Sequence, residues 1–524
     1  MKKIFKFEDI INFSDLSSAC IDSDGKIAAV VKRDIDAKTG GYKSKIVLND
    51  ISSGRSWTYN ENEESSEKQP VLLKDGRMLY MSNVTGNWQI FIARFAGDVD
   101  DIAGDRSRQL TTLRHGIRSY RVSEDGGQLT FETVLFPGEE DSGQWKEELL
   151  ADEREKWKKG QASMAYEISG IPYRKEEWNG IRKGERTFVG TLDMVSGEQK
   201  LIRTGELGCV RPYAEEQVFG TASVMDIGLG HNRRACIMGA WNEPEELWVV
   251  DSGNGGRNER VRLTNINQEM NDYLFPEIED ISSSVNKKWP GAGIWLVHPK
   301  NEDNGPVPAV LWIREEGDRS PSSLDYGIWD LVSGGMAVIL ADPGEIHDEQ
   351  EREDLLMEAL DHAVATGVID ERRIGITGRG FGGYTAGRLL GKKDRFSAAV
   401  IRSALVDPAT AFGTCEALCD IPSAYGDDIR MLDLLRELVD ESVTAAVDSI
   451  DTPLLIMHGY RDSVFVFQQA EQFFVAMKDR RPEIPSRLIM FPGEDHGIEK
   501  NGKFYNRISY YAAMKDWFQR YLGE

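Results

Sequence analysis

A glycine-rich turn is the first feature of this sequence that bears on chemistry, and it reads Gly378-Arg379-Gly380-Phe381-Gly382. A strand-like stretch precedes the turn and a helical stretch follows it. Turns of this frame carry a nucleophile, usually serine, at the middle residue, which the fold holds at positive φ. Glycine adopts that conformation at little cost but has no hydroxyl, so Gly380 keeps the turn and removes the reactive group. The backbone NH of Phe381 remains as a donor for a developing oxyanion.

An acid and a base follow later in the chain, each after a strand-like apolar stretch. Asp462 comes after residues 454–457, and His496 comes after residues 488–491. A buried aspartate can orient an imidazole and stabilise its charged form, and histidine moves protons near neutral pH. The turn, the acid and the base occur in the chain order that hydrolases with a nucleophile elbow use. We therefore predict that Asp462 and His496 form a hydrogen-bonded pair that faces Gly380.

Four side chains adjoin this predicted site and are candidates for binding the carboxylate or carbonyl of a substrate. They are Arg379, Tyr384, Tyr460 and Arg461. The competing interpretation, which we favour for each residue taken alone, is a role in packing or a place on the surface. The sequence contains no phosphate-binding Gly-Lys loop and no set of metal ligands, so we infer no cofactor and no metal.

The second half of the chain alternates strands and helices, and we assign residues 276–524 to one domain. Two nearly continuous apolar runs, 307–313 and 336–341, are typical of strands buried on both faces. The alternation predicts a doubly wound, mostly parallel sheet of the α/β-hydrolase type, with its chemistry at the carboxyl ends of the strands. We expect helices over 349–366, 383–391, 468–479 and 506–522, and further strands over 374–377, 398–401, 454–457 and 488–491.

The first half, residues 1–275, consists of short strands and turns that repeat. Asp-Gly turns begin at Asp24, Asp75 and Asp125, at intervals of 51 and 50 residues, and a strand-like stretch follows each turn. Repeats of roughly 40–50 residues are typical of β-propeller blades, which bury their faces only against neighbouring blades. We therefore predict an N-terminal all-β propeller with about five to seven blades. A β-sandwich with coincidental Asp-Gly turns is the alternative.

One stretch, residues 144–159, interrupts this pattern. It sets Trp145, Leu149, Leu150 and Trp157 among many charged residues, a pattern of an exposed amphipathic helix or arm. We interpret the stretch as a solvated insertion in a blade. A lid over the site or a contact within a homo-oligomer is the alternative.

Composition excludes several classes of function. The formal net charge of −24 opposes nucleic-acid binding, because contact with phosphates needs clustered Lys and Arg. No apolar run of about eighteen residues is present, and charges interrupt the N-terminal stretch before a secretory signal forms, so we expect no membrane association. The cysteines are few and odd in number, which suits a reducing compartment and predicts a cytoplasmic protein. They are Cys20, Cys209, Cys236, Cys415 and Cys419.

Four segments around the turn, the acid and the base resemble the prolyl oligopeptidase family, nearest its acylaminoacyl-peptidase-like branch. The resemblance implies a serine peptidase fold in which short peptides reach a site between a propeller and a hydrolase domain. We therefore expect a short peptide or a small molecule as the ligand. The four segments are 370–374 before the turn, 395–400 after it, 452–459 before the acid and 491–497 around the base.

The sequence departs from that family at three places. Gly380 stands where the family has its nucleophilic serine. Residues 314–318, Arg-Glu-Glu-Gly-Asp, replace a His-Gly-Gly-Pro or comparable oxyanion segment, and residues 342–345, Asp-Pro-Gly-Glu, replace an Arg-Gly-Ser stretch. A laboratory substitution would alter Gly380 alone, so the other departures favour natural divergence. We expect a very poor peptidase, since loss of the serine of a triad lowers kcat by about 10⁶.

Three hypotheses from different classes describe the function, and whether the chain is an enzyme stays open among them. The first, which we favour, is a family homologue that acts on or binds short peptides or small molecules without covalent catalysis. The second is a non-covalent hydrolase, lyase or isomerase in which Asp462 and His496 act as a general base. The third is an active serine peptidase captured in a substituted form, which requires a Ser codon at position 380 of the natural gene.

Overall fold

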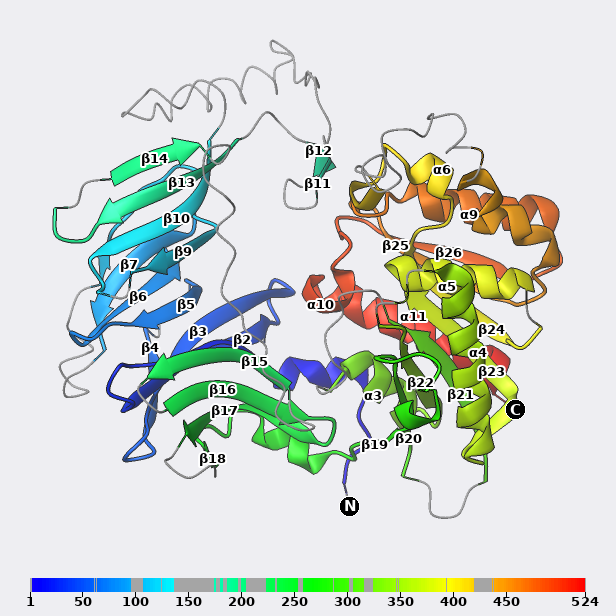
Figure 1. Ribbon diagram of the computed structural model, residues 1–524, viewed down its shortest axis with the longest axis horizontal. Coiled ribbons are helices and arrows are strands. Elements are labelled where there is room, and N and C mark those ends of the chain that lie inside the picture. Colours follow the sequence, from blue (N-terminus) through cyan, green and yellow to red (C-terminus); the bar gives the residue numbers. More distant parts are fainter. Residues whose placement is uncertain are drawn as a thin grey trace, which may run out of the picture.

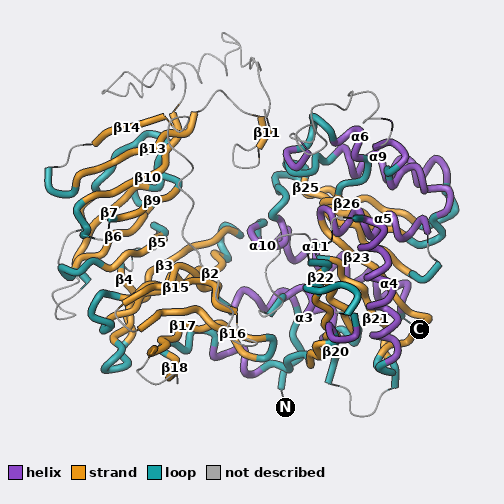
Figure 2. Tube along the Cα trace, in the orientation of Figure 1, coloured by secondary structure: helices purple, strands orange, loops and turns teal. Residues whose placement is uncertain are grey.

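The chain forms two domains, the first built mainly of strands in its described part and the second built of strands and helices (Figures 1 and 2). The computed structural model describes the chain except for residues 1, 61, 63, 96–106, 124, 136–173, 176–179, 182–185, 197–198, 204–222, 231–232, 253–257, 286, 301–304, 315–323, 345, 347, 393, 419–435, 437 and 524. The stretch 144–159, interpreted above as an insertion, lies outside the described residues.

The described part of the N-terminal domain contains four sheets of four antiparallel strands each. The first sheet has β1 (Asp15–Ile21), β2 (Ile27–Asp36), β3 (Gly41–Asp50) and β4 (Ser56–Tyr59). The second has β5 (Glu67–Leu72), β6 (Arg77–Ser82), β7 (Gln89–Arg94) and β8 (Arg108–Gln109). The third has β9 (Ser119–Val122), β10 (Gln128–Leu135), β13 (Arg186–Asp193) and β14 (Gln199–Arg203). The fourth has β15 (Ser223–Gly230), β16 (Arg233–Ala240), β17 (Glu243–Ser252) and β18 (Asn258–Arg262), and β11 (Arg174–Lys175) pairs with β12 (Gly180–Ile181) in a separate ribbon.

The repeated Asp-Gly turn joins the first strand of a sheet to the second in three successive sheets. Gly25, Gly76 and Gly126 occupy these turns with φ of +67°, +81° and +74°. Glycine favours this left-handed region, because a side chain would clash there. The sequence repeat and the structural repeat therefore coincide, and the predicted propeller is confirmed.

Apolar cores between neighbouring sheets hold the four sheets in an arc (Figure 1). The first and second sheets share a core that includes Ile46 and Met78. The fourth and first sheets share a core that includes Ile237 and Val30. The number of blades stays a prediction, because most of residues 136–222 lies outside the described part of the chain.

The C-terminal domain is built on one eight-stranded sheet with the order β19-β20-β22-β21-β23-β24-β25-β26. The six strands from β22 to β26 in this order are parallel, and the two strands at the other edge are antiparallel. The expected strands are all present. Their bounds are β19 (Glu277–Asp280), β20 (Gly293–His298), β21 (Val307–Ile313), β22 (Ala337–Asp342), β23 (Ile369–Arg379), β24 (Ala398–Ala404), β25 (Leu454–Gly459) and β26 (Ser486–Phe491).

Helices cover both faces of this sheet, as the doubly wound prediction requires. α4, α5 and α9 pack on one face, where Leu311 and Ile376 point, and α3 and α11 pack on the other face, where Val310 and Val400 point. The helices are α3 (Tyr326–Ser333), α4 (Glu349–Ala365), α5 (Gly380–Lys392), α6 (Pro408–Ala411), α9 (Gln468–Arg480), α10 (Ile498–Asn501) and α11 (Phe504–Leu522). Short 3₁₀ turns are η1 (Phe7–Asn12), η3 (Gln268–Asp272), η4 (Ser282–Ser284), η5 (Glu416–Leu418) and η6 (Val443–Ser449).

The N-terminal segment before β1 packs with the C-terminal domain. Phe5, Phe7 and Phe13 are buried in the core that α3 and α11 form, and the Phe5 ring stacks on Trp329 at 4.0 Å. The sequence boundaries place this segment with the propeller, whereas its packing joins it to the C-terminal core. The chain therefore contributes to the C-terminal core from both sides of the propeller.

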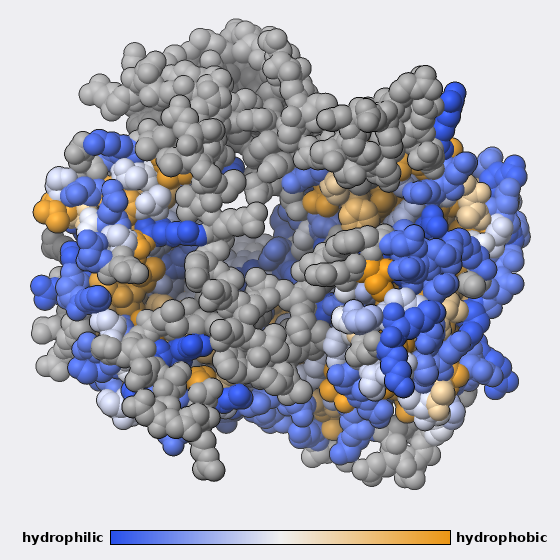
Figure 3. Space-filling view, viewed as in Figure 1, coloured by the Kyte–Doolittle hydropathy of each residue, from blue (hydrophilic) through white to orange (hydrophobic). Residues whose placement is uncertain are grey.

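The surface of the described residues is mainly hydrophilic on the face seen in Figure 3, with scattered apolar side chains. Among the helices of the described part, none is long and apolar enough to span a membrane. Cys236 and Cys415 are buried and Cys20 is partly buried, while Cys209 and Cys419 lie outside the described residues.

Candidate active site

The glycine-rich turn stands between β23 and α5, which begins at Gly380. Gly380 has φ of +57°, the left-handed conformation that the sequence predicts for the middle residue. Close contacts explain the glycines at positions 378 and 383, where a side chain would clash. A Cβ on Gly378 would lie 2.2 Å from the carbonyl oxygen of Gly382, and a Cβ on Gly383 would lie 2.5 Å from the Cβ of Ala404. The turn is therefore fixed by backbone packed on backbone.

Asp462 and His496 form the predicted hydrogen bond at the ends of β25 and β26. His496 Nδ1 lies 2.8 Å from Asp462 Oδ2, and the Phe465 NH donates to Asp462 Oδ1 at 3.0 Å. Burial raises the pKa of the Asp462 carboxyl, but hydrogen bonds from His458 and His496 outweigh burial and lower the pKa to about 2. An ionised carboxylate only accepts, so Nδ1 of His496 carries the proton and Nε2 of the neutral ring is an acceptor. This is the tautomer that a general base needs.

A second imidazole, His458, shares the Asp462 carboxylate and was missed as a site residue in the sequence. His458 Nε2 lies 3.3 Å from Asp462 Oδ2 and 2.7 Å from the carbonyl oxygen of Phe465. A carbonyl only accepts, so this nitrogen carries a proton and donates. The spacing of four residues in His458-Gly459-Tyr460-Arg461-Asp462 is the signal that could have indicated the contact.

Two contacts bring the turn and the acid–base pair together. The Arg379 Nη1 donates to the main-chain carbonyl of His496 at 3.3 Å. The Phe465 ring lies 5.2 Å from the Phe381 ring and 5.7 Å from the His496 imidazole, edge-on in both cases. The residue after Gly380 and the imidazole therefore contact the same aromatic ring.

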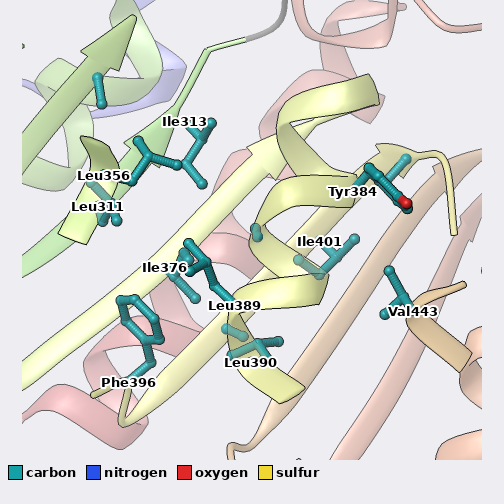
Figure 4. Packing of buried hydrophobic residues seen from close by; sticks show 14 of the residues in the cluster. Leu311, Ile313, Leu356, Ile376, Tyr384, Leu389, Leu390, Phe396, Ile401 and Val443 are labelled. Carbon is teal, nitrogen blue, oxygen red and sulfur yellow. The ribbon is translucent and has the colours of Figure 1, made fainter. Parts of the chain in front are cut away.

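The four candidate binding residues separate into one that lies inside the site and three that do not. Arg379 is largely buried beside the His496 carbonyl and Glu499. Tyr384 points into the core around α5 (Figure 4), and its hydroxyl donates to the Glu441 carbonyl at 2.8 Å. Burial raises the Tyr384 pKa to about 12. The packing interpretation thus describes Tyr384 better than the binding interpretation.

The other two candidates lie on the surface. Tyr460 is 57% exposed, and its ring is tilted against Phe467 at 5.4 Å. Arg461 is exposed, and its backbone NH donates to the Glu494 carbonyl at 2.8 Å. Among the described residues, neither side chain forms a hydrogen bond or an ion pair with Asp462 or His496.

The segment expected to form the oxyanion site begins beside the turn. A Cβ on Gly382 would lie 2.8 Å from the carbonyl oxygens of Ile313 and Arg314, so the turn packs against the end of β21. Glu315 and Glu316, which depart from the family pattern, lie outside the described residues, as does Glu345. The described residues contain no group of three or more potential metal ligands.

A glycine turn after β23, an acid after β25 and a base after β26 meet at one edge of an α/β-hydrolase sheet. Residues 346–524 match the prolyl oligopeptidase family. The match spans the glycine turn and the acid–base pair of this chain. It supports the family resemblance of the C-terminal domain without assigning a role to Gly380.

Curated relatives match part of the chain. The uncharacterized peptidase YuxL of Bacillus subtilis is 31% identical over 173 residues, which are 32% of this chain and 25% of that protein. The acylamino-acid-releasing enzyme of Arabidopsis thaliana is 24% identical over 274 residues, 47% of this chain and 34% of that protein. The matched region thus spans about a quarter to a third of these relatives.

Solved structures extend the similarity of fold to the whole chain. The acylaminoacyl peptidase of Pyrococcus horikoshii superposes with a TM-score of 0.77 over 99% of this chain and 98% of that chain, at 14% identity. The AtxE2 isopeptidase superposes with a TM-score of 0.69 over 100% and 96% of the two chains, at 16% identity. The fold is therefore a propeller joined to an α/β-hydrolase domain.

Proposed function

We propose that this protein binds short peptides or small molecules at the turn beside Asp462 and His496 and forms no covalent acyl-enzyme. The observation that carries the proposal is Gly380 at φ +57° in the middle of the turn. The backbone that would present a serine hydroxyl is intact, and the hydroxyl is absent. A relative named as a peptidase and another named as an acylamino-acid-releasing enzyme support the class of ligand.

The test restores the missing hydroxyl. Gly380→Ser would place an oxygen beside His496, which takes its proton as that oxygen attacks the phosphorus of a fluorophosphonate and fluoride leaves. We expect stoichiometric labelling of Gly380→Ser and no labelling of the matched variant Gly380→Ala. An unlabelled but folded Gly380→Ser protein would contradict descent of this site from a hydrolytic one.

A second function, general-base catalysis without an acyl-enzyme, is favoured by the intact acid–base pair. Asp462 stays ionised well below neutral pH and holds the proton on Nδ1 of His496. A positioned histidine contributes about 10²–10⁴-fold through proton transfer alone. Turnover that His496→Ala abolishes, with no covalent intermediate, would establish this function. Turnover unchanged in His496→Ala would exclude it.

Three further expectations from the sequence remain proposals. Natural divergence at Gly380 predicts a Gly codon in the natural gene, and a Ser codon there would instead identify a substituted peptidase. A cytoplasmic location predicts that cell fractionation recovers the protein with cytosolic markers. Analytical ultracentrifugation would test whether the chain forms a homo-oligomer.

A further inference from the structure

A cavity lies between the propeller and the C-terminal domain, apart from the acid–base pair. It encloses about 510 Å³. The propeller contributes residues of β1, β2 and β17, and the C-terminal domain contributes the ends of β21 and β24 together with α3 and α11. The cavity therefore belongs to the junction of the two domains.

Its lining is cationic, although the whole chain has a formal net charge of −24. Burial raises the pKa of Glu245 to about 8, and repulsion from Asp15 adds to the effect. Burial also raises the pKa of Asp325. With a pKa of about 8, Glu245 is mostly protonated at neutral pH, which lowers the negative charge of the lining. The lining contains Arg33, Arg314, Arg379, Arg402, Lys500 and Arg507 against Asp15, Glu245, Asp325 and Glu499.

Arg402 is the most deeply buried of these cations, with 1% of its surface exposed. Its Nε donates to the Thr377 hydroxyl at 2.9 Å, and its Nη1 pairs with the Glu499 carboxylate. The guanidinium lies 4.1 Å from the centre of the Trp312 ring. Nη2 makes no hydrogen bond to any residue that the structure describes.

Arg507 approaches the cavity from α11 and is 7% exposed. Its Nε donates to the main-chain carbonyl of Glu499 at 2.9 Å, and its Nη1 donates to the Tyr42 hydroxyl at 2.7 Å. Within the described part of the chain, no carboxylate lies within 4.0 Å of this guanidinium and Nη2 has no hydrogen-bond acceptor. Arg507 bonds only the main chain of Glu499, whose carboxylate pairs with Arg402.

Neither Nη2 is among the fully buried side-chain atoms that lack a partner, so both donors keep accessible surface at the cavity and can bind a ligand oxygen. Arg402 and Arg507 both hold Glu499, one through its side chain and the other through its main chain, so they reach the cavity from one side. Each retains a donor, and guanidinium forks match the planar geometry of a carboxylate.

We propose that this cavity binds the carboxylate of a short peptide through Arg402 and Arg507. The assignment deepens the proposed peptide-binding function and rests on it. Apolar and aromatic residues in the same lining, among them Trp241, Met270 and Trp312, accommodate the body of the ligand. Arg379 also lines the cavity and donates to the His496 carbonyl, so the bound peptide extends from the carboxylate subsite toward the turn at Gly380.

Calorimetry with a matched pair of peptides tests the assignment on the unmodified chain. Acetyl-glycyl-phenylalanine carries one charge, its carboxylate, and the corresponding C-terminal amide carries none. We expect the acid to bind about 10-fold to 100-fold more tightly than the amide, the range for hydrogen bonds to a charged group. Inorganic phosphate serves as the second probe, and we expect it to bind more weakly than the acid because it contacts no apolar wall.

Two variants locate the binding. Arg507→Gln removes the charge, and Arg520→Gln, on the exposed face of the same helix, is its control. Leu324 lines the cavity, and Leu324→Trp adds bulk there while both arginines stay in the chain, so this variant tests the cavity if Arg507→Gln does not fold. We expect about a 10-fold or greater loss of affinity for the acid with Arg507→Gln or Leu324→Trp, and no change with Arg520→Gln.

Three results would overturn the carboxylate subsite. They are equal affinity for the acid and the amide, unchanged affinity in a folded Leu324→Trp protein, and phosphate binding as tight as that of the acid. Binding is measured without any reaction, so the outcome is independent of the labelling of Gly380→Ser. A labelled serine variant with no carboxylate preference would reject the subsite alone, whereas carboxylate binding without labelling would reject the hydrolytic ancestry alone.

Discussion

The turn after β23 and the two loops after β25 and β26 hold their shapes by opposite means. In the turn, Gly378 and Gly382 allow backbone to pack on backbone, and no side chain is needed. In the loops, buried polar side chains hold the geometry through the bonds of Asp462 to His496 and to the Phe465 NH. The turn therefore keeps its conformation without a serine hydroxyl at position 380. The loops, in contrast, depend on the Asp462 carboxylate for their conformation.

This difference explains how the site can lack a nucleophile while its backbone keeps the conformation of a nucleophile turn. A glycine at position 380 needs no support, because φ of +57° is a natural conformation for it. The aspartate needs its partners, because an ionised carboxylate that is buried without them would be strongly destabilised. Four substitutions test the contrast, and the expected effects decrease from the first to the last.

A side chain added at the close backbone contact of the turn should destabilise the protein. Gly378→Ala places a Cβ 2.2 Å from the Gly382 carbonyl oxygen, and we expect it to destabilise the protein by about 3 kcal/mol, the upper range for overpacking. Gly380→Ala is the matched control, for which we expect about 1–2 kcal/mol from the left-handed backbone. Urea unfolding measures both. An equal loss of stability in Gly378→Ala and Gly380→Ala would show that the close contact at Gly378 costs no more than the left-handed backbone at Gly380.

Removal of the Asp462 carboxylate should lower the free energy of unfolding, because this carboxylate holds the two loops. The pKa of Asp462 falls from the usual 3.8 to about 2 in the folded protein. Its stabilisation is therefore fully present above about pH 4 and is lost as the pH falls toward 2. We expect Asp462→Asn to cost about 2 kcal/mol at pH 7, from a shift of nearly two units.

Urea unfolding at pH 7, 5, 4 and 3 follows this loss. The gap between the native protein and Asp462→Asn should stay constant down to about pH 4 and narrow below it. A gap that is the same at pH 3 and at pH 7 would show that the carboxylate charge does not hold the loops.

Tyr384 tests whether a candidate binding residue belongs to the packing beneath the turn. Its hydroxyl donates to the Glu441 carbonyl at 2.8 Å and accepts from Arg388 at 3.4 Å. We expect Tyr384→Phe to lower the free energy of unfolding by about 1 kcal/mol, the usual value of one hydrogen bond, and to leave peptide affinity unchanged. If Tyr384→Phe binds peptide more weakly and unfolds with unchanged free energy, Tyr384 is a binding residue.

Tyr460 should have the smallest effect on stability. Its side chain is 57% exposed and contacts the Phe467 ring. Surface substitutions usually change stability by less than about 0.5 kcal/mol, and we expect this of Tyr460→Ala. Thermal unfolding checks the value. A loss above about 1 kcal/mol would make Tyr460 part of the loop framework.

The sequence predicts those parts of this molecule that depend on local patterns. The strand expected over 307–313 is β21, because a continuous apolar run identifies a strand buried on both faces. The helix expected over 349–366 is α4, within one residue at its C-terminal end. The turn at Gly380 can be recognised in the sequence because positive φ and close backbone contact both require glycine.

The remaining parts depend on contacts between residues far apart in the chain. Arg402, Glu499 and Arg507 come from β24, α10 and α11, and nothing in their separate surroundings indicates that they meet. The Phe465 ring links the turn to the imidazole only because the sheet places the four strands β23, β24, β25 and β26 side by side. The packing of Phe5 and Phe7 with the C-terminal core is likewise a tertiary result.

Intact-mass measurement of the native protein after treatment with excess fluorophosphonate tests the central claim most directly. Ser403 is the nearby hydroxyl to watch, because it has φ of +39° and its buried oxygen has no hydrogen-bond partner among the described residues. The account predicts an unmodified mass, because Gly380 offers no hydroxyl to the acid–base pair. A single adduct at Ser403 or at any other residue, lost in His496→Ala, would contradict it.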